Sequence, residues 1–309
     1  MESNRSKERL LPYNRKQFIL DSLKITSGAL VIPAAGFSNP LSGMLFPPSY
    51  TVKDIMDIIL KEVPGAPFKE TVDTLKAGNA EQKVTGVVTT MFATIELIRK
   101  AIKLNANFII AHEPTFYNHT DDHNWVKNNS VVQQKLELLN NHNITVWRFH
   151  DYCHSLKPDA ISYGVAKLAN WLPYFKSGET TLTIPALKLE DLVAHLKKSL
   201  GISHVKVIGD LNQSCSKISL LPGAWGGQMH VSTVEQQKPD VLVVGEVQEW
   251  ETAEYIRDAR ALGAKTALIV LGHCVSEEPG MQWLPEWLAP KLPGLSVTHI
   301  PSGDPFLWK

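Results

Sequence analysis

The segment NFIIAHEPTFYNH, residues 107–119, joins a short apolar run to two side chains of types that bind metal ions. The run FIIA is rich in branched and aromatic residues, which is typical of a buried strand. It stops at His112 and Glu113, and Pro114 then interrupts the chain. Because sites in open α/β sheets form at the carboxyl ends of strands, this ending predicts a site at the edge of such a sheet.

The residues on both sides of this strand alternate between helical and extended patterns. The periodicity predicts helices near 52–59, 95–102, 132–139, 162–171, 193–200, 251–262 and 281–288. It predicts strands at 83–91, 108–111, 144–150, 205–209, 217–221, 240–245, 266–272 and 295–300. This alternation indicates an α/β fold with helix-covered sheets. We expect a domain over residues 50–309, made of two similar lobes at about 50–175 and 185–309, with a metal cleft between them.

The bulk composition excludes several classes of protein. Lys+Arg and Asp+Glu both number 31, so there is no basic excess of the kind that nucleic-acid binding requires. No apolar run approaches the length of a membrane span. The three cysteines show no CxxC spacing, so we expect buried thiols at Cys153, Cys215 and Cys274 and no disulfide framework.

The N-terminal segment, residues 1–40, has the order of an export signal. The basic stretch NRSKERLLPYNRKQ precedes the apolar FILDSLKITSGALVIPAAG, which ends in small residues. It resembles a twin-arginine signal in which Lys16 replaces the second arginine and Asp21 interrupts the apolar part. We therefore expect an exported or periplasmic protein. The alternative is a disordered tail or an extra helix on a cytoplasmic protein.

Two further apolar strands also run into pairs of potential ligands. VWRFH at 146–150 continues into DYCH, and ALIVLG at 267–272 continues into HCVSEE. The three strand ends together carry His112, Glu113, His150, His154, His273 and Glu277. Loops from distant segments converge at the carboxyl ends of strands, so we expect these side chains to meet in one cleft. A single histidine is more often structural, but the coincidence at three strand ends favours a metal site.

The chemistry of this set points to two divalent ions. His112, His154 and His273 with the carboxylates of Glu113 and Glu277 make a nitrogen and oxygen set that suits zinc, manganese or iron. Two such ions can share a hydroxide and stabilise both the attacking and the leaving oxygen. We expect His150 to be either an additional ligand or a partner that orients one. Asp151 adjoins the same motif, but we favour His154 over Asp151 as a ligand.

The chain resembles the Nif-three-like dinuclear metal-centre proteins over about residues 50–303. Its segments AHEP (111–114), HDYCH (150–154) and GHCVSE (272–277) follow the order of that family's motifs, His-His-Pro, His-x-x-x-Asp and Gly-His-x-x-[Thr/Ser]-Glu. The strand DVLVVGEVQEW (240–250) looks like the family's strand that ends in Thr-Gly-Glu or Thr-Gly-Asp. The resemblance implies a dinuclear metal centre and a ring-like homo-hexamer with its clefts facing an internal cavity.

Two ligand positions depart from the family pattern. Glu113 stands where the family has its second histidine, and His154 stands where it has aspartate. Together the two changes exchange an imidazole and a carboxylate and restore an inventory of three histidines and two carboxylates. This reciprocity favours a retained metal site with a changed metal preference. The alternative is a site that has decayed.

For function, the sequence favours a metal-dependent hydrolase that acts on a small molecule. Relatives are often labelled GTP cyclohydrolase I type 2, but the sequence contains no P-loop for a nucleotide. The alternative is a non-catalytic protein that binds or handles metal. We expect Glu246 to orient a ligand or move a proton, unless it is a solvent-facing carboxylate. Three glycines match the family's Gly-rich loop and would approach a substrate, although backbone conformation alone also explains them: Gly223, Gly226 and Gly227.

Overall fold

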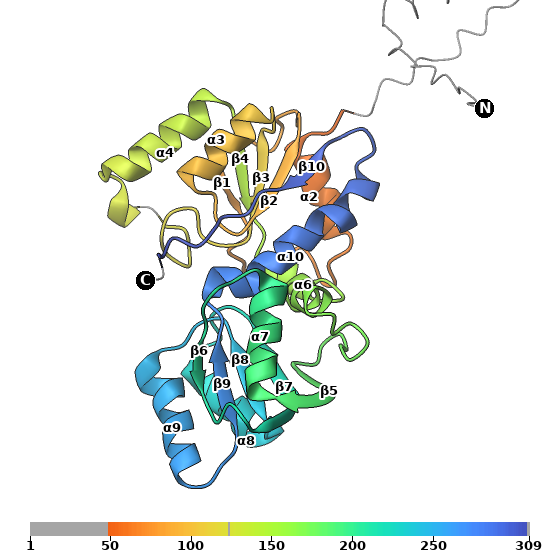
Figure 1. Ribbon diagram of the computed structural model, residues 1–309. Coiled ribbons are helices and arrows are strands. Elements are labelled where there is room, and N and C mark those ends of the chain that lie inside the picture. Colours follow the sequence, from red (N-terminus) through yellow and green to blue (C-terminus); the bar gives the residue numbers. More distant parts are fainter. Residues whose placement is uncertain (1–48, 123, 308–309) are drawn as a thin grey trace, which may run out of the picture. The chain divides into compact units, whose positions relative to one another are not determined.

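The computed structural model describes residues 49–122 and 124–307, which form two α/β lobes on two five-stranded sheets (Figure 1). The predicted α/β class and the two-lobe architecture are therefore confirmed. The predicted export signal at 1–40 lies outside the described residues. Within the described part of the chain, every helix is too short or too polar to cross a membrane.

The sheet of the first lobe is mainly parallel. Its strands lie in the order β1 (Leu75–Ala77), β4 (Thr145–Arg148), β3 (Phe108–Ala111), β2 (Val87–Thr90) and β10 (Val297–His299). Only the pairing of β1 with β4 is antiparallel among these neighbours. Ala111 lies opposite Thr90 on one side and Arg148 on the other. Strands β3 and β4 therefore end side by side, and the residues that follow them meet at one edge.

Helices cover both faces of this sheet. One face packs against α2 (Val52–Leu60) and α10 (His273–Leu288), and the other against α3 (Ile95–Lys103) and α4 (Ser130–Asn141). Helix α2 begins with a reciprocal cap, in which Thr51 accepts from the Asp54 amide and the Asp54 side chain accepts from the Thr51 amide. Its apolar residues recur at helical spacing, as the sequence predicted, and they fill the core.

The second lobe also has a five-stranded sheet covered by helices, but its edge strands pair differently. Its strands lie in the order β5 (Thr181–Lys188), β7 (Ser214–Leu221), β8 (Val241–Val244), β9 (Ala267–Val270) and β6 (Lys206–Ile208). The three central strands are parallel and both edge strands are antiparallel. Helix α7 (Leu189–Leu200) packs on one face, and α8 (Gly227–Gln237) and α9 (Glu254–Ala261) pack on the other.

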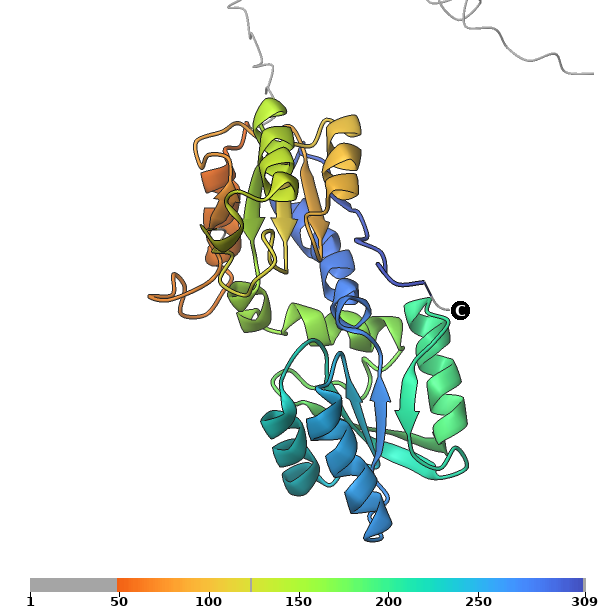
Figure 2. The same cartoon turned by 90° about the vertical axis from the view of Figure 1, so that its left-hand side faces the viewer.

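Helices α6 (Ala160–Leu168) and α10 cross in close contact between the two sheets (Figures 1 and 2). The first turn of α6 packs into the core of the first lobe, and its later residues pack into the core of the second. A Cβ atom built on Gly164 would lie 2.4 Å from the Gly280 backbone nitrogen, and one on Gly280 would lie 2.7 Å from the Ile161 Cα. Only glycine at both positions permits this crossing, which joins the two lobes.

The C-terminal part of the chain departs from the expected lobe limits. The second lobe was expected to run to residue 309, but β10 pairs with β2 in the first sheet. The apolar residues of α10, among them Met281, Leu284 and Leu288, complete the first core. Burial of these residues against the first sheet is the physical reason for the return of the chain.

Several elements differ from the sequence prediction. Helix α10 starts at His273, eight residues before the predicted start at 281, and it continues through Pro279 and Pro285. The predicted helix at 251–262 is a π-helical turn, Glu249–Ala253, followed by α9. The sequence prediction missed β1, β5, α8 and the short helix α5 (Asp151–Ser155).

Candidate metal centre

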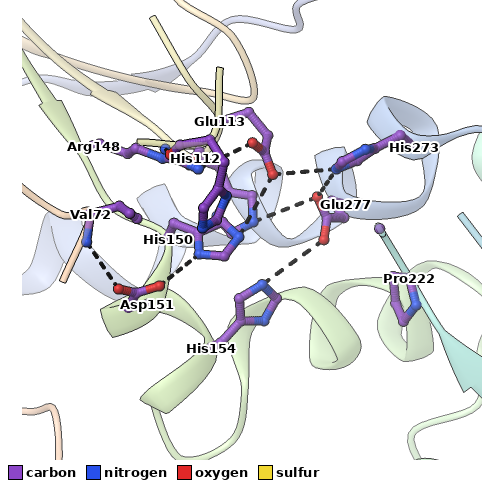
Figure 3. A network of polar contacts seen from close by, with 12 residues as sticks. Val72, His112, Glu113, Arg148, His150, Asp151, His154, Pro222, His273 and Glu277 are labelled. Atoms are coloured by element: carbon purple, nitrogen blue, oxygen red, sulfur yellow. Dashed lines mark hydrogen bonds and ion pairs between the residues drawn. The ribbon is translucent and has the colours of Figure 1, made fainter. Parts of the chain in front are cut away.

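The first half of the site stands where two neighbouring strands of the first lobe end. His112 and Glu113 directly follow β3, and His150 follows β4 after one residue. The pairing of these strands brings the three side chains together. His150 precedes α5, and the His154 amide donates to the His150 carbonyl oxygen at 3.0 Å, so His154 stands one helical turn further on. Figure 3 shows their side chains turned toward one another.

The second half of the site comes from the start of α10. Strand β9 ends two residues before Gly272, whose φ of +107° is one that glycine adopts without strain. His273 and Glu277 then lie one helical turn apart, which places both on the same side of the helix (Figure 3). Glu246 follows the neighbouring strand β8. The carboxyl ends of the two sheets thus supply the two halves of the site.

The six residues predicted as ligands lie together in the structure. His273 Nε2 lies 3.0 Å from Glu277 Oε2 and 3.3 Å from Glu113 Oε1. His112 Nε2 lies 3.6 Å from Glu277 Oε2, and His154 Nε2 lies 3.9 Å from Glu277 Oε1. His150 Nε2 lies 3.7 Å from Glu113 Oε1. Every one of these imidazoles therefore presents Nε2 to a carboxylate oxygen of the cluster.

The other ring nitrogen of each histidine faces outward to an acceptor. The His112 Nδ1–H donates to the Phe149 carbonyl oxygen at 3.0 Å. The remaining Nδ1 atoms donate at 2.9–3.0 Å to one carboxylate each, in the pairs His150–Asp151, His154–Asp159 and His273–Glu246. Metal-binding histidines commonly have such a partner behind them, because it sets the ring orientation and leaves Nε2 for the metal.

The buried donor set fits a divalent metal ion. His112 is fully buried, and its Nε2 atom has no hydrogen-bond partner among the described residues. An unpartnered buried nitrogen is costly, and a metal ion at Nε2 would satisfy it. Two overlapping groups hold their ligand atoms within 4.8 Å of one another, namely His112 with His150 and His154, and His112 with Glu113 and Glu277. These are nitrogen and oxygen ligands of the kind that zinc, manganese and iron take.

The charges of the cluster are strongly coupled. Burial alone would raise the pKa of the Glu277 carboxyl, but His112 and His273 outweigh it and hold that pKa well below its usual range. Burial would lower the pKa of His273, but its contacts with Glu113 and Glu277 raise it to about 11. Burial would also raise the pKa of Glu113, but its contact with His273 and the charge of His112 lower it, so both carboxylates are ionised at neutral pH. A metal ion at His273 Nε2 would displace a proton.

Arg148 is a residue of this site that the sequence analysis missed. It is fully buried at the end of β4, and its Nη2 atom lies 3.3 Å from Glu113 Oε2. Its Nε–H donates to the His112 carbonyl oxygen at 3.3 Å, and a second guanidinium nitrogen donates to the His119 carbonyl. Arg148 thus holds one oxygen of Glu113 and leaves Oε1 for the cluster. The signal in the sequence was a charged residue inside the apolar strand VWRFH.

Replacing Arg148 with methionine should destabilise the metal-free protein by about 3–5 kcal/mol, because it removes the buried cation that faces the Glu113 and Asp121 carboxylates. Denaturant titration in the presence of a metal chelator measures the change in the free energy of unfolding. In a Glu113→Gln background the same substitution should cost clearly less, because one of the two buried carboxylates that face Arg148 is then uncharged. Equal costs in the two backgrounds would contradict the pairing. As a control, Lys206→Met removes an exposed ion pair with Glu249 and should change stability little.

A cavity of about 1370 Å³ adjoins the cluster. Its walls come from both lobes and from the C-terminal segment, and they include Pro114, Tyr117, Trp225 and residues 302–305. Lys135 also lines it, with a pKa lowered to about 8 by burial. His150, His154, His273, Glu113 and Glu277 all face this cavity. A ligand of small-molecule size would therefore contact the cluster from one open side.

The remaining candidate residues have distinct positions. Glu246 contacts His273 Nδ1 from behind, which fits the expected orienting role. A Cβ on Gly223, whose φ is +76°, would lie 2.1 Å from Glu277 Oε1, so this glycine makes room for the carboxylate. Gly227 faces Glu251, and no described atom beyond its chain neighbours lies within 4 Å of a Cβ on Gly226. Of the three glycines of this loop, Gly223 is therefore the one that lies against the cluster.

Comparison with known proteins identifies relatives of this fold. The model of the family Duf34/NIF3 (NGG1p interacting factor 3) matches residues 50–305. A Clostridium perfringens protein named GTP cyclohydrolase 1 type 2 homolog is 21% identical over 240 residues, which cover 74% of this chain and 87% of the relative. A Clostridium acetobutylicum protein of the same name is 24% identical over 250 residues, covering 75% and 87%. The crystal structure of Staphylococcus aureus hypothetical protein SA1388 has a TM-score of 0.68 at 20% identity and covers 84% of this chain and 99% of its own.

Proposed function

Because the chain belongs to the Duf34/NIF3 family, we propose that it holds two divalent metal ions and hydrolyses a small molecule in the adjoining cavity. The observation that supports this most is the convergence of four Nε2 atoms and two ionised carboxylates in one cluster, most of whose residues line that cavity. Divalent ions bound there would supply Lewis acidity and lower the pKa of water.

The chain's own residues have separate parts in this proposal. Glu113 and Glu277 supply two negative charges, which would offset part of the charge of two divalent cations. The carboxylates of Asp151, Asp159 and Glu246 hold three imidazoles in orientation through Nδ1. Burial of His112, Glu113 and Glu277 strengthens the charge interactions that these side chains make.

The cavity supports one of the two candidate functions over the other. A purely structural metal site is normally closed by protein ligands, whereas a catalytic site keeps an open position. Here the cluster opens onto a cavity large enough for a small molecule, and this favours the hydrolase over the metal-handling alternative. The name of the two clostridial relatives makes purine-ring hydrolysis one reaction to test.

Elemental analysis and a substrate screen test this proposal. We expect about two divalent ions per chain and turnover of a nucleotide, phosphoester or amide substrate by the metal-loaded protein. His273→Ala should lose turnover and at least one metal ion, whereas His142→Ala, which removes an exposed imidazole, should retain turnover and metal content. Turnover that is unchanged in His273→Ala would remove the metal centre from the mechanism. A fully loaded protein that is inactive on all substrate classes would favour the metal-handling function.

The proposal also covers assembly and location. By its resemblance to the family we propose a homo-hexamer, and sedimentation of a stable monomer would contradict that. The basic and apolar order of residues 1–40 supports export. An intact N-terminus on cytosolic protein purified from cells would contradict export.

A further inference from the structure

We infer that the two metal positions of this centre are chemically unlike, one rich in imidazole and one rich in carboxylate, and that they select different metal ions. The imidazole-rich position consists of His112, His150 and His154. The carboxylate-rich position consists of Glu113, His273 and Glu277. This inference rests on the proposed metal centre and specifies which ion each part of it takes.

The imidazole-rich position is a compact group of three rings. The ring centroids are 4.8 Å apart for His112 and His150, and 5.0 Å apart both for His112 and His154 and for His150 and His154. One ligand atom from each ring lies within 4.8 Å of the other two. Each ring has its Nδ1 bonded to an outer acceptor, so the three Nε2 atoms are the ones offered to an ion.

The carboxylate-rich position is set by Arg148. Because Arg148 contacts Glu113 Oε2, that carboxylate offers only Oε1, which lies 3.3 Å from His273 Nε2. Glu277 Oε2 lies 3.0 Å from the same His273 nitrogen. Two carboxylate oxygens and one imidazole nitrogen therefore meet at this side. Glu277 also extends Oε1 toward His154, at 3.9 Å, so it contacts both positions.

The exchange of residues at 113 and 154 makes the two metal positions chemically unlike. With histidine at 113 and aspartate at 154, as in the family pattern, each position would have two imidazoles and one carboxylate. The residues of this chain instead give three imidazoles on one side, and one imidazole with two carboxylates on the other. Imidazole suits zinc, copper, nickel and iron, whereas carboxylate oxygen suits manganese and magnesium. The first position should therefore take Zn²⁺, and the second should accept Mn²⁺.

Stepwise metal loading tests this inference on the full-length protein. Metal-free protein is given one equivalent of Zn²⁺ and then excess Mn²⁺, and it is desalted before elemental analysis and Mn²⁺ electron paramagnetic resonance. We expect one Zn²⁺ and one Mn²⁺ per chain. In a Zn²⁺ titration against a chromogenic chelator, the second ion should bind at least about tenfold more weakly than the first.

The reciprocal variants provide the matched comparison. In Glu113→His/His154→Asp the two donor sets become equal, so the two Zn²⁺ affinities should converge to within about threefold. Glu113→His alone should lose the Mn²⁺ position, and His154→Asp alone should lose the preference of the first position for Zn²⁺. Because both residues serve one centre, the effects of the single changes should not add in the double variant. His142→Ala should behave as the unmodified protein.

The outcomes separate this inference from the proposed function. Two Zn²⁺ ions of indistinguishable affinity in the unmodified protein, or Mn²⁺ that fails to enter beside one Zn²⁺, would overturn the inference and leave the metal centre intact. Absence of any bound metal would overturn the proposed function itself. If a variant does not fold, as judged by circular dichroism, the titration of the unmodified protein decides alone.

Discussion

Glu277→Gln should remove both metal ions, with a loss of affinity of at least about 100-fold, which exceeds the usual effect of losing an outer partner of a ligand. Glu277 is 3% exposed, and its two oxygens face different imidazoles, Oε2 toward His112 and His273 and Oε1 toward His154. Glutamine keeps the shape of the side chain but removes the negative charge that both positions share. A change at a residue of one position alone should affect mainly one ion.

Elemental analysis after dialysis measures the metal content per chain, and chelator competition measures the metal affinity. Glu278→Gln is the matched control, because Glu278 is the next residue of the same helix and contacts His299 and the Ser302 amide outside the cluster. It should retain two ions. Retention of one tightly bound ion by Glu277→Gln would show that Glu277 serves a single position.

Gly164→Ala should destabilise the protein by about 2–4 kcal/mol, although alanine is normally the better helix former. The added methyl would lie 2.4 Å from the Gly280 nitrogen and from the carbonyl of Pro279, which are backbone atoms that cannot rotate away. Helices α6 and α10 would have to separate. Because α10 carries His273 and Glu277 while Asp159 caps α6 and holds His154, the separation should also weaken metal binding.

Denaturant unfolding of the metal-free protein measures the first effect, and chelator competition measures the second. Gly178→Ala is the control variant, because it adds a methyl group without steric overlap. Gly178 has a φ of +86°, and no described atom beyond its chain neighbours lies within 4 Å of an added methyl, so only strain of about 1 kcal/mol is expected. Metal affinity should not change in Gly178→Ala. A Gly164→Ala protein as stable as the unmodified one would contradict the close crossing of the helices.

The prediction of the candidate site from sequence succeeded where the relevant information was local. A buried strand requires a run of apolar residues, so the end of FIIA at His112 was visible in the chain itself. The same reasoning found His150 and His273, because each follows an apolar strand. Parallel strands end at one edge, so the pattern also predicted that His112 and His150 meet, whereas their meeting with His273 depends on how the two sheets pack. Their roles as ligands remain predictions.

Local patterns were misleading where tertiary contacts decided the outcome. The periodicity predicted a helix only from 281, but packing of α10 against the first core keeps the helix continuous from His273 through Pro279. His273 and Glu277 therefore lie one helical turn apart on the same side of α10. A loop in this segment would not fix that geometry. The same packing returned the last strand to the first sheet, because it buries Met281, Leu284 and Leu288 in the first core.

The sequence by itself determined the α/β alternation, the strand ends and the types of ligand offered, because each of these depends on neighbours along the chain. The tertiary structure alone decided which oxygen of Glu113 faces the cluster, since Arg148, a residue 35 positions away, takes the other. It also decided that Glu246 stands behind His273 and that the cluster opens onto a cavity. Contacts of this kind depend on how two sheets and two crossing helices pack, and periodicity in one strand or helix carries no record of that packing.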